Sequence, residues 1–255
     1  MRFASLGSGS RGNATLISQG KTTILVDCGF SARETEKRMH TLEVDASNLT
    51  AIIVTHEHSD HIGGVRVLAR KYNLPVYATA GTAGCLSADL TELITEFSSH
   101  DVFAIDDIEV RPFPVPHDAR EPSQFVFNDG QHRVGILTDV GMITPVIEQA
   151  LSLCDALLLE ANHDIDMLDN GDYPDHLKYR VSGRLGHLNN VQSAKLLEKI
   201  DTSHLQHIVA MHLSEKNNSP NIVTPLFAQA LNCDQSWITV AKQDTGFGWR
   251  ETTNS

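Results

Sequence analysis

The sequence contains few cysteines, and no two of them are close together. The four lie far apart, at Cys28, Cys85, Cys154 and Cys233. Because there is no Cys-x-x-Cys pair, the chain has neither the spacing of a cysteine zinc site nor the framework of a disulfide-stapled protein. We therefore expect reduced thiols, most of them buried as small apolar side chains.

Long apolar runs are also missing. No stretch approaches the roughly 20 apolar residues that a membrane span requires, so we expect no membrane association. The opening residues, 1–7, lack the apolar segment of a signal peptide. A cytoplasmic location is the resulting expectation.

Basic residues are outnumbered by acidic ones. Lysine and arginine total 20 against 32 aspartates and glutamates, which gives a formal net charge of −12. This charge argues against non-specific coating of nucleic acid, because polyanions repel one another. Exposed charges are screened over about 10 Å in 0.1 M salt, so the local charge around a site matters more than the total.

The chain shows no internal linker, repeat or low-complexity tract. Its 255 residues, of which 41% are hydrophobic, can build one large core. We expect a single domain over residues 1–255.

Histidine, by contrast, is plentiful, with 13 in the chain. Four metal-capable side chains occur within six residues in the segment Thr55-His56-Glu57-His58-Ser59-Asp60-His61. The apolar, β-branched residues 51–54 predict a buried strand before this segment, and apolar spacing over 65–72 predicts a helix after it. The histidines therefore occupy the end of a strand, where sites gather in α/β proteins.

The spacing within this segment favours metal binding. His56 and His58 are two residues apart, so in an extended chain they point to the same side and can hold one cation. Asp60 and His61 follow where the chain turns, and they can face a second cation. The alternative is a run of polar residues in a surface loop, which one histidine pair would fit better than four ligand types.

The pattern His-x-His-x-Asp-His resembles the signature of the metallo-β-lactamase superfamily. The resemblance implies an α/β fold, a four-layer αββα sandwich with a dinuclear metal site at one edge. It also implies further ligands at the ends of later strands. Three residues occupy such positions: His117 after a proline-rich strand, Asp139 in Thr138-Asp139-Val140-Gly141, and His212 after the strand 208–211.

The resemblance then gives a complete ligand set. One cation takes His56, His58 and His117, the other takes Asp60, His61 and His212, and Asp139 bridges the two. Nitrogen and oxygen ligands suit Zn²⁺, with Mn²⁺ or iron possible. Two such metals can share a hydroxide that serves as the nucleophile at neutral pH. The chemistry expected is metal-dependent hydrolysis.

Residues in the second half indicate the substrate. Glu160 and Gly186-His187 resemble the acid and histidine motifs of the transfer-RNA 3′-processing nucleases of this superfamily. The resemblance makes His187 a general acid and Glu160 its orienting partner, while Asp60 can orient the attacking hydroxide. An alkoxide leaving group needs a proton more than a thiolate does, so the pair favours phosphodiesters over thioesters. The alternative is a helix-opening histidine without a role in the reaction.

Other residues are candidates for contacts with substrate. The loop Gly7-Ser8-Gly9-Ser10-Arg11-Gly12 matches a dinucleotide-binding pattern, but strands follow it, so a Rossmann fold is excluded. Its Ser8, Ser10 and Arg11 could line the mouth of a site, or the loop could be a plain turn. Three basic residues near His187 could hold flanking phosphates; these are Lys178, Arg180 and Arg184. His163 could meet the 5′ end of the substrate or the metals.

Over nearly its whole length the chain resembles the YycJ/WalJ group of bacterial metallo-β-lactamase-fold hydrolases. The resemblance is carried by residues 7–13, 160–164, 186–190 and 212–218, and it implies a 5′→3′ exonuclease acting on DNA. The alternative is a small-molecule hydrolase with the same site: a cyclic phosphodiesterase, a glyoxalase-type thioesterase or a lactonase. The net charge favours that alternative. A binding module that retained the metal ligands is a third possibility.

Four further expectations concern local structure. Asp27 should support the ligand loops through hydrogen bonds, and Asn189 should cap a helix that runs to about residue 200. The polar residues 166–179 predict a loop or insertion near the site. Residues 236–249 predict a closing pair of strands.

Overall fold

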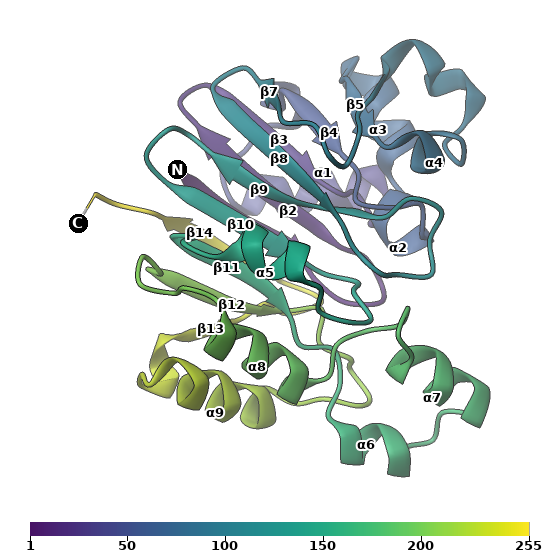
Figure 1. Ribbon diagram of the computed structural model, residues 1–255. Helices are drawn as coiled ribbons and strands as arrows, with labels where there is room; N and C mark the ends of the chain where they lie inside the picture. The colour runs from purple at the N-terminus through teal and green to yellow at the C-terminus, as the bar shows by residue number, and fades with distance from the viewer. Residues whose placement is uncertain (255) are drawn as a thin grey trace.

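Two mixed β-sheets form the centre of the computed structural model, which describes residues 1–254. Within these residues each sheet has seven strands, and the two sheets face one another (Figure 1). The first sheet has the order β14-β1-β2-β3-β4-β5-β6. Its strands are β1 (Arg2–Gly7), β2 (Ala14–Gln19), β3 (Thr22–Val26), β4 (Ala51–Ile53), β5 (Val76–Ala78), β6 (Ile94–Glu96) and β14 (Phe247–Glu251).

The second sheet has the order β13-β12-β11-β10-β9-β8-β7. Its strands are β7 (Phe103–Ile105), β8 (Ile108–Pro114), β9 (Ser123–Asn128), β10 (Arg133–Leu137), β11 (Ala156–Glu160), β12 (His207–Met211) and β13 (Ile238–Val240). Strands β10 to β13 are parallel to one another, as are β3 to β6 in the first sheet. Parallel strands are usually buried on both faces, and β11 accordingly has only buried residues.

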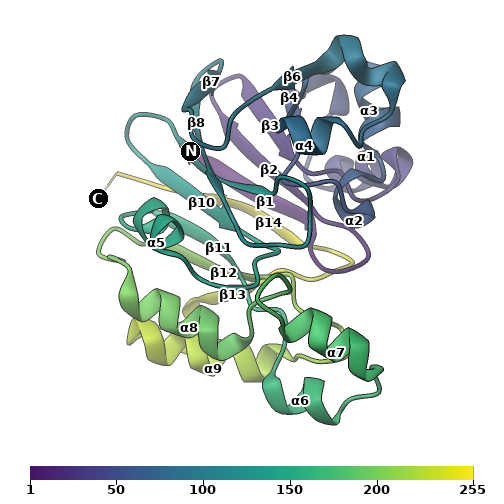
Figure 2. The same cartoon turned by 45° about the vertical axis from the view of Figure 1, so that its right-hand side comes forward.

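Helices cover the outer faces of both sheets (Figures 1 and 2). On the first sheet these are α1 (Ala32–Thr41), α2 (Ser59–Ile62), α3 (Val65–Tyr72) and α4 (Ala80–Ala83). On the second they are α5 (Pro145–Leu151), α8 (Asn190–Lys199) and α9 (Pro220–Leu231). Two further helices, α6 (Ile165–Asn170) and α7 (Asp175–Ser182), project beside the end of α8 (Figure 2). Short 3₁₀ turns occur at Ala46–Asn48, Ala88–Leu93 and Gln235–Trp237.

Three apolar layers hold these elements together. Between the sheets, Phe3 and Ile53 pack with Phe125, Phe127 and Met211. A second layer lies between the first sheet and helices α1 and α3, and a third lies between the second sheet and helices α5, α8 and α9. Burial of apolar side chains in three successive layers is the main stabilising contribution in such a fold. The predicted αββα sandwich is confirmed.

The strand ends bring polar residues to one edge of the sandwich. Asp27 follows β3, Asp139 follows β10 and His212 follows β12, and all three adopt left-handed backbone conformations, with φ of 60°, 54° and 53°. Such conformations cost non-glycine residues about 1 kcal/mol or more each. A residue in the left-handed conformation thus turns the chain at each of these three strand ends, and its side chain lies at the same edge of the sandwich.

Two local expectations were wrong in part. Residues 166–179 do lie near the site, where Tyr173 and Leu177 line the cavity, but they form most of α6 and α7 and not a loop. Helix α6 is capped by the Asp164 side chain, which accepts a hydrogen bond from Met167 N–H. The strands β13 and β14 both exist, but they do not pair with one another. Strand β13 pairs with β12 in the second sheet, whereas β14 pairs with β1 in the first.

The predicted cap of α8 is confirmed, because Asn189 accepts a hydrogen bond from Gln192 N–H at 2.9 Å and forms a complete capping box. None of the helices within residues 1–254 combines the length and the apolar character that crossing a bilayer requires.

Candidate metal centre

The first group of donors consists of three histidines from two loops. His56 Nε2 lies 3.0 Å from His58 Nδ1, and His117 Nε2 lies 3.3 Å from the same His58 atom. Nitrogens of all three rings lie within 4.8 Å of one another. The structure thus brings together the three residues that the sequence assigned to one cation.

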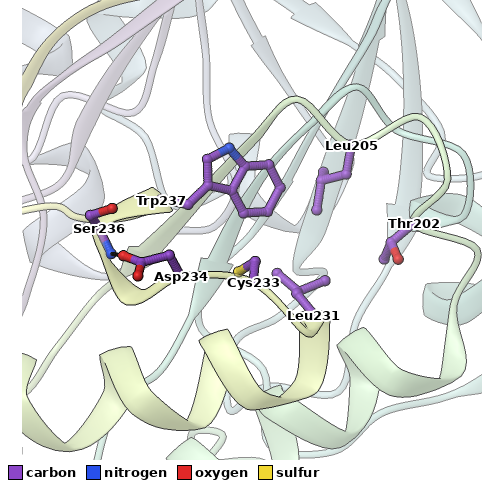
Figure 3. A pocket seen from close by; sticks show the side chains of 7 residues that line it. All are labelled: Thr202, Leu205, Leu231, Cys233, Asp234, Ser236 and Trp237. Atoms are coloured by element: carbon purple, nitrogen blue, oxygen red, sulfur yellow. Dashed lines mark hydrogen bonds between the residues drawn. The ribbon is translucent and has the colours of Figure 1, made fainter.

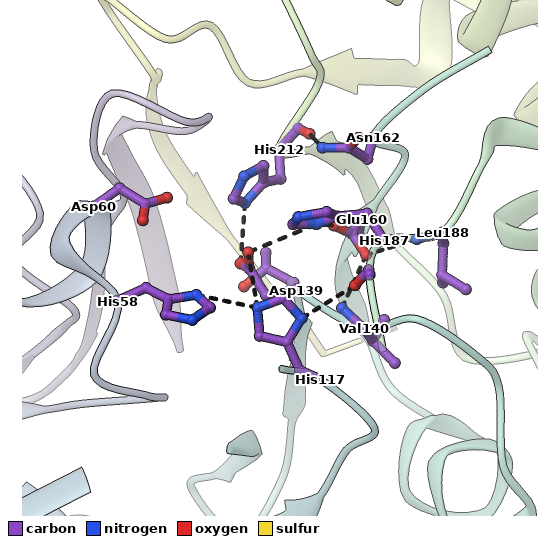
Figure 4. Close-up of polar contacts among 12 residues, drawn as sticks. His58, Asp60, His117, Asp139, Val140, Glu160, Asn162, His187, Leu188 and His212 are labelled. Atoms are coloured by element: carbon purple, nitrogen blue, oxygen red, sulfur yellow. Dashed lines mark hydrogen bonds and ion pairs between the residues drawn. The ribbon is translucent and has the colours of Figure 1, made fainter. Parts of the chain in front are cut away.

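The second group of donors surrounds Asp139 (Figure 4). Asp139 Oδ2 lies 3.2 Å from His61 Nε2 and 3.0 Å from His212 Nδ1, and its Oδ1 lies 3.9 Å from His117 Nε2. Asp60 Oδ2 lies 3.5 Å from His61 Nε2. One carboxylate oxygen of Asp139 therefore faces the second set and the other faces the first. This is the arrangement that a bridging ligand needs.

The chemistry of these donors fits divalent cations. Asp139 Oδ2 and His212 Nδ1 are both buried, and neither makes a hydrogen bond of acceptable geometry with any residue of 1–254 despite their 3.0 Å separation. A buried polar atom without a hydrogen bond costs about 1–3 kcal/mol. Converging imidazoles and carboxylates that lack such bonds are a donor set suited to Zn²⁺, Mn²⁺ or Fe²⁺.

Electrostatics set the protonation states of the donors. Burial holds the pKa of His56 well below its usual value, so this ring is neutral, as a metal ligand must be. Burial tends to raise the pKa of Asp139, but His212 and His61 outweigh it and hold this pKa well below its usual range, so Asp139 is a carboxylate. Burial lowers the pKa of His61, whereas the carboxylates of Asp139 and Asp27 raise it well above its usual value, so without a metal this ring carries a proton that a bound cation would displace.

The predicted support by Asp27 is present. Its Oδ1 accepts a hydrogen bond from Thr55 N–H at 2.8 Å, and its Oδ2 lies 2.8 Å from His61 Nδ1. The Thr55 hydroxyl donates to the same Oδ2 at 2.9 Å. These contacts fix the His61 ring so that Nε2 faces Asp139, as hydrogen bonds behind a metal ligand commonly do.

Sequence reasoning missed two residues that orient donors. Asn13 Nδ2 lies 3.1 Å from His61 Nε2 and 3.3 Å from Asp60 Oδ2. Asn162 Nδ2 donates to the His212 carbonyl at 3.1 Å, while His212 N–H donates to Ser8 Oγ at 2.8 Å. Both asparagines belong to stretches that carry the family resemblance, 7–13 and 160–164, and this membership was the available signal.

Glu160 and His187 form a pair beside the donors. Glu160 Oε1 lies 2.7 Å from His187 Nδ1, and its Oε2 accepts hydrogen bonds from Val140 N–H and Leu188 N–H. His187 Nδ1 also lies 3.7 Å from Asp139 Oδ1. Burial opposes protonation of His187, but the charge of Glu160 outweighs it and raises the pKa of this imidazole to about 9. With Nδ1 held by Glu160, Nε2 is the nitrogen available for contacts in the site.

The family described as "Beta-lactamase superfamily domain" has a sequence model that matches residues 22–213 of this chain. The chain belongs to this family. The predicted membership is therefore confirmed, and the matched segment includes every candidate metal donor, from His56 to His212, together with Asp27.

Named relatives match along most of their length. Exodeoxyribonuclease YycJ of Bacillus anthracis is 36% identical over 235 residues, which cover 91% of this chain and 89% of the relative. Exodeoxyribonuclease WalJ of Streptococcus pneumoniae serotype 2 (strain D39) is 33% identical over 223 residues, which cover 85% of this chain and 83% of the relative. The metallo-β-lactamase fold protein YhfI from Bacillus subtilis has a similar structure, with a TM-score of 0.72 at 17% identity over 98% of this chain and 99% of that one.

In this β-lactamase superfamily chain a cavity of about 240 Å³ opens onto the donors. His58, Asp60 and Asp139 line it together with His187 and His212. Of the residues predicted to contact substrate, Ser10 and Arg180 line this cavity.

The remaining candidates for substrate contact lie elsewhere. The Arg11 guanidinium bonds to Glu215 and Asp244. Lys178 donates to the Asp169 carbonyl, and Arg184 Nε lies 3.4 Å from Met142 Sδ. Ser8 is buried against His212. His163 is buried with Nδ1 3.3 Å from Asn162 Oδ1, and burial lowers its pKa to about 4.

A larger hollow of about 630 Å³ lies elsewhere, past the end of α9 (Figure 3). Leu205, Leu231, Cys233 and Trp237 contribute to its lining. It contains none of the site residues predicted from the sequence. Size alone therefore does not identify the reactive site, whereas the converging donors do.

Proposed function

We propose that this member of the β-lactamase superfamily is a metal-dependent phosphodiesterase, and specifically a DNA exonuclease working 5′→3′ within a single domain. The observation that carries the proposal is the Glu160–His187 pair, in which the buried Glu160 carboxylate lies 2.7 Å from His187 and His187 lines the cavity together with Asp139. A hydrolase of thioesters has less need for such a proton donor, because a thiolate leaves readily without one.

The ligands proposed are those expected from the sequence. His56, His58 and His117 would hold one cation, Asp60, His61 and His212 the other, and Asp139 would contact both. Zinc and manganese are the proposed ions, and iron also suits the donors. A pair of divalent cations supplies an activated water and neutralises charge on the phosphoryl group.

The remaining roles belong to the protein. Asp60 lines the cavity close to His61 and is placed to orient the attacking water. Glu160 holds His187 through Nδ1, so that the opposite ring nitrogen can give a proton to the leaving oxygen of the substrate. Glu160 is itself fixed by the two backbone N–H groups of Val140 and Leu188.

The relatives support DNA as the substrate. YycJ and WalJ are both named exodeoxyribonucleases, and each matches more than four fifths of this chain. The net charge of −12 by itself favours a small-molecule substrate, but the cations would supply positive charge at the point where the phosphodiester binds.

The proposal is tested with three substrates in parallel. Protein loaded with Zn²⁺ or Mn²⁺ is incubated with 5′-phosphorylated linear DNA, a cyclic nucleotide and a glutathione thioester. We expect nucleotides to be released from the DNA and the other two to be spared. Hydrolysis of the cyclic nucleotide or thioester with intact DNA would instead support the small-molecule hydrolase.

A further inference from the structure

Residues 164–183 form a cover over the cavity, and we call this segment the cover. It contains α6 and α7, which lie beside the end of the sandwich (Figure 2). Helix α7 has no buried residue, so it does not belong to any of the three apolar layers. Nevertheless Leu177, Arg180 and Val181 of α7 line the cavity together with His58 and His212.

One contact joins the cover to the loop that follows β8. Arg180 Nε donates to Asp118 Oδ2 at 2.7 Å, directly after the donor His117. The side chains of Arg180 and Asp118 are 55% and 31% exposed. Exposed ion pairs are individually weak, so this contact can open.

A second contact joins the cover to the loop that follows β12. The Lys216 ammonium lies 5.5 Å from the centroid of the Tyr173 ring, within the range of a cation–π interaction. Tyr173 also lines the cavity. These two side-chain contacts thus tie the cover to two different loops, one after His117 and one after His212. Backbone hydrogen bonds also hold the cover near its two ends, from Asp164 N–H to the Asn217 carbonyl and from His187 N–H to the Val181 carbonyl.

The size of the cavity limits what fits beneath the cover. Its volume of about 240 Å³ is below the roughly 300–1,000 Å³ typical of pockets for drug-sized ligands. We take this space as enough for about one nucleotide unit. A nucleic-acid strand that continued in both directions would have to pass the loops to which Arg180 and Tyr173 are tied.

We propose that the cover restricts the site to the ends of nucleic-acid chains, and that Arg180 and Tyr173 determine this specificity. This inference rests on the proposed phosphodiesterase function. A chain end enters the cavity with its first nucleotide, whereas an uninterrupted strand is excluded while both contacts are closed. Opening the cover converts an enzyme that requires ends into one that also cuts within strands.

The test compares linear and circular DNA of the same sequence. The substrates are 5′-phosphorylated linear single-stranded DNA, its covalently closed circle, and the p-nitrophenyl ester of thymidine 5′-monophosphate as a small reporter. The double variant Arg180→Ala/Tyr173→Ala removes both contacts. Tyr179→Ala is the matched control. Tyr179 precedes Arg180 on α7, but it is 78% exposed and does not line the cavity.

We expect the metal-loaded wild type and the Tyr179→Ala control to degrade linear DNA and spare the circle. The double variant should cut the circle roughly tenfold faster than the wild type, the combined effect of losing two weak contacts. If this variant does not fold, Arg180→Ala/Lys216→Ala removes the same two contacts without altering Tyr173 and is held to the same criterion.

A folded, metal-loaded double variant that still spares the circle overturns the inference and leaves the proposed exonuclease intact. A wild type that cuts the circle as fast as the linear DNA overturns the exonuclease and the inference with it, but leaves the phosphodiesterase chemistry intact. Failure to hydrolyse either linear DNA or the reporter overturns the phosphodiesterase function itself, and the inference with it.

Discussion

Glu160 and His187 are 27 residues apart in the sequence, yet Glu160 Oε1 lies 2.7 Å from His187 Nδ1. Glu160 is the last residue of β11, and His187 precedes the cap of α8. The contact places the imidazole between a buried carboxylate and Asp139, whose Oδ1 is 3.7 Å away. The chemical role that we assign to this site depends on that arrangement.

Replacing His187 should impair the reaction without emptying the metal centre. His187→Ala removes the proton donor, and general acids contribute about 10²- to 10⁴-fold to rate, so we expect a loss of that size in kcat on DNA. Steady-state kinetics combined with elemental analysis of the purified variant measures both quantities. Retention of full activity would refute the general-acid role, and loss of metal would assign His187 to the ligands instead.

Glu160 should act on the reaction only through His187. Glu160→Gln keeps the shape of the side chain but removes its charge, so kcat should fall. The double variant Glu160→Gln/His187→Ala should have about the same kcat as His187→Ala alone, because the two residues work as a unit. A double-mutant cycle on kcat measures this. Losses that add independently would show that Glu160 has a separate role.

Asp27 should contribute to metal affinity although it lies behind His61. Asp27→Asn suits the left-handed backbone at this position, with φ of 60°, but weakens the bonds to Thr55 and His61. Removing such a partner typically lowers metal affinity about 10- to 100-fold. Competition with a chelator measures the metal affinity. Asp45→Asn, at an exposed position, is the control. Equal metal affinities in the two variants would contradict the contribution of Asp27 to metal binding.

Two of the four cysteines should be unreactive in the folded protein. Burial raises the pKa of both Cys28 and Cys154 to about 12, and only the thiolate attacks an alkylating reagent. Because these two thiols are buried and almost wholly protonated near neutral pH, native protein should incorporate iodoacetamide only at Cys85 and Cys233, which are half-buried. Peptide mass spectrometry reads the sites, and rapid native labelling of Cys28 would show that the first sheet opens around it.

The sequence was most informative where chemistry and spacing coincide. Residues 51–54 predicted the strand end and residues 56–61 predicted the donors, because an apolar, β-branched run and a polar cluster are both local properties. Asp139 and His212 were assigned as ligands through the family resemblance, on positions just after apolar strands. All of these donors lie together in the structure.

Other features depend on tertiary structure and leave a weaker local signal. Helix α7 buries no side chain, so it has no apolar periodicity from which a helix could be predicted. The pattern of residues 236–249 predicts strands but does not indicate which strands they pair with. In the structure β13 and β14 belong to different sheets. The bond from His212 N–H to Ser8 Oγ joins residues 204 positions apart, and nothing in either loop alone indicates it.

The convergence of strand ends on a pair of cations is tested most directly by anomalous diffraction from crystals of the metal-loaded protein. We predict two peaks, one among His56, His58 and His117 and the other among Asp60, His61 and His212, with Asp139 between them. A crystal grown with excess Zn²⁺ or Mn²⁺ that shows no peak among these residues would contradict the account.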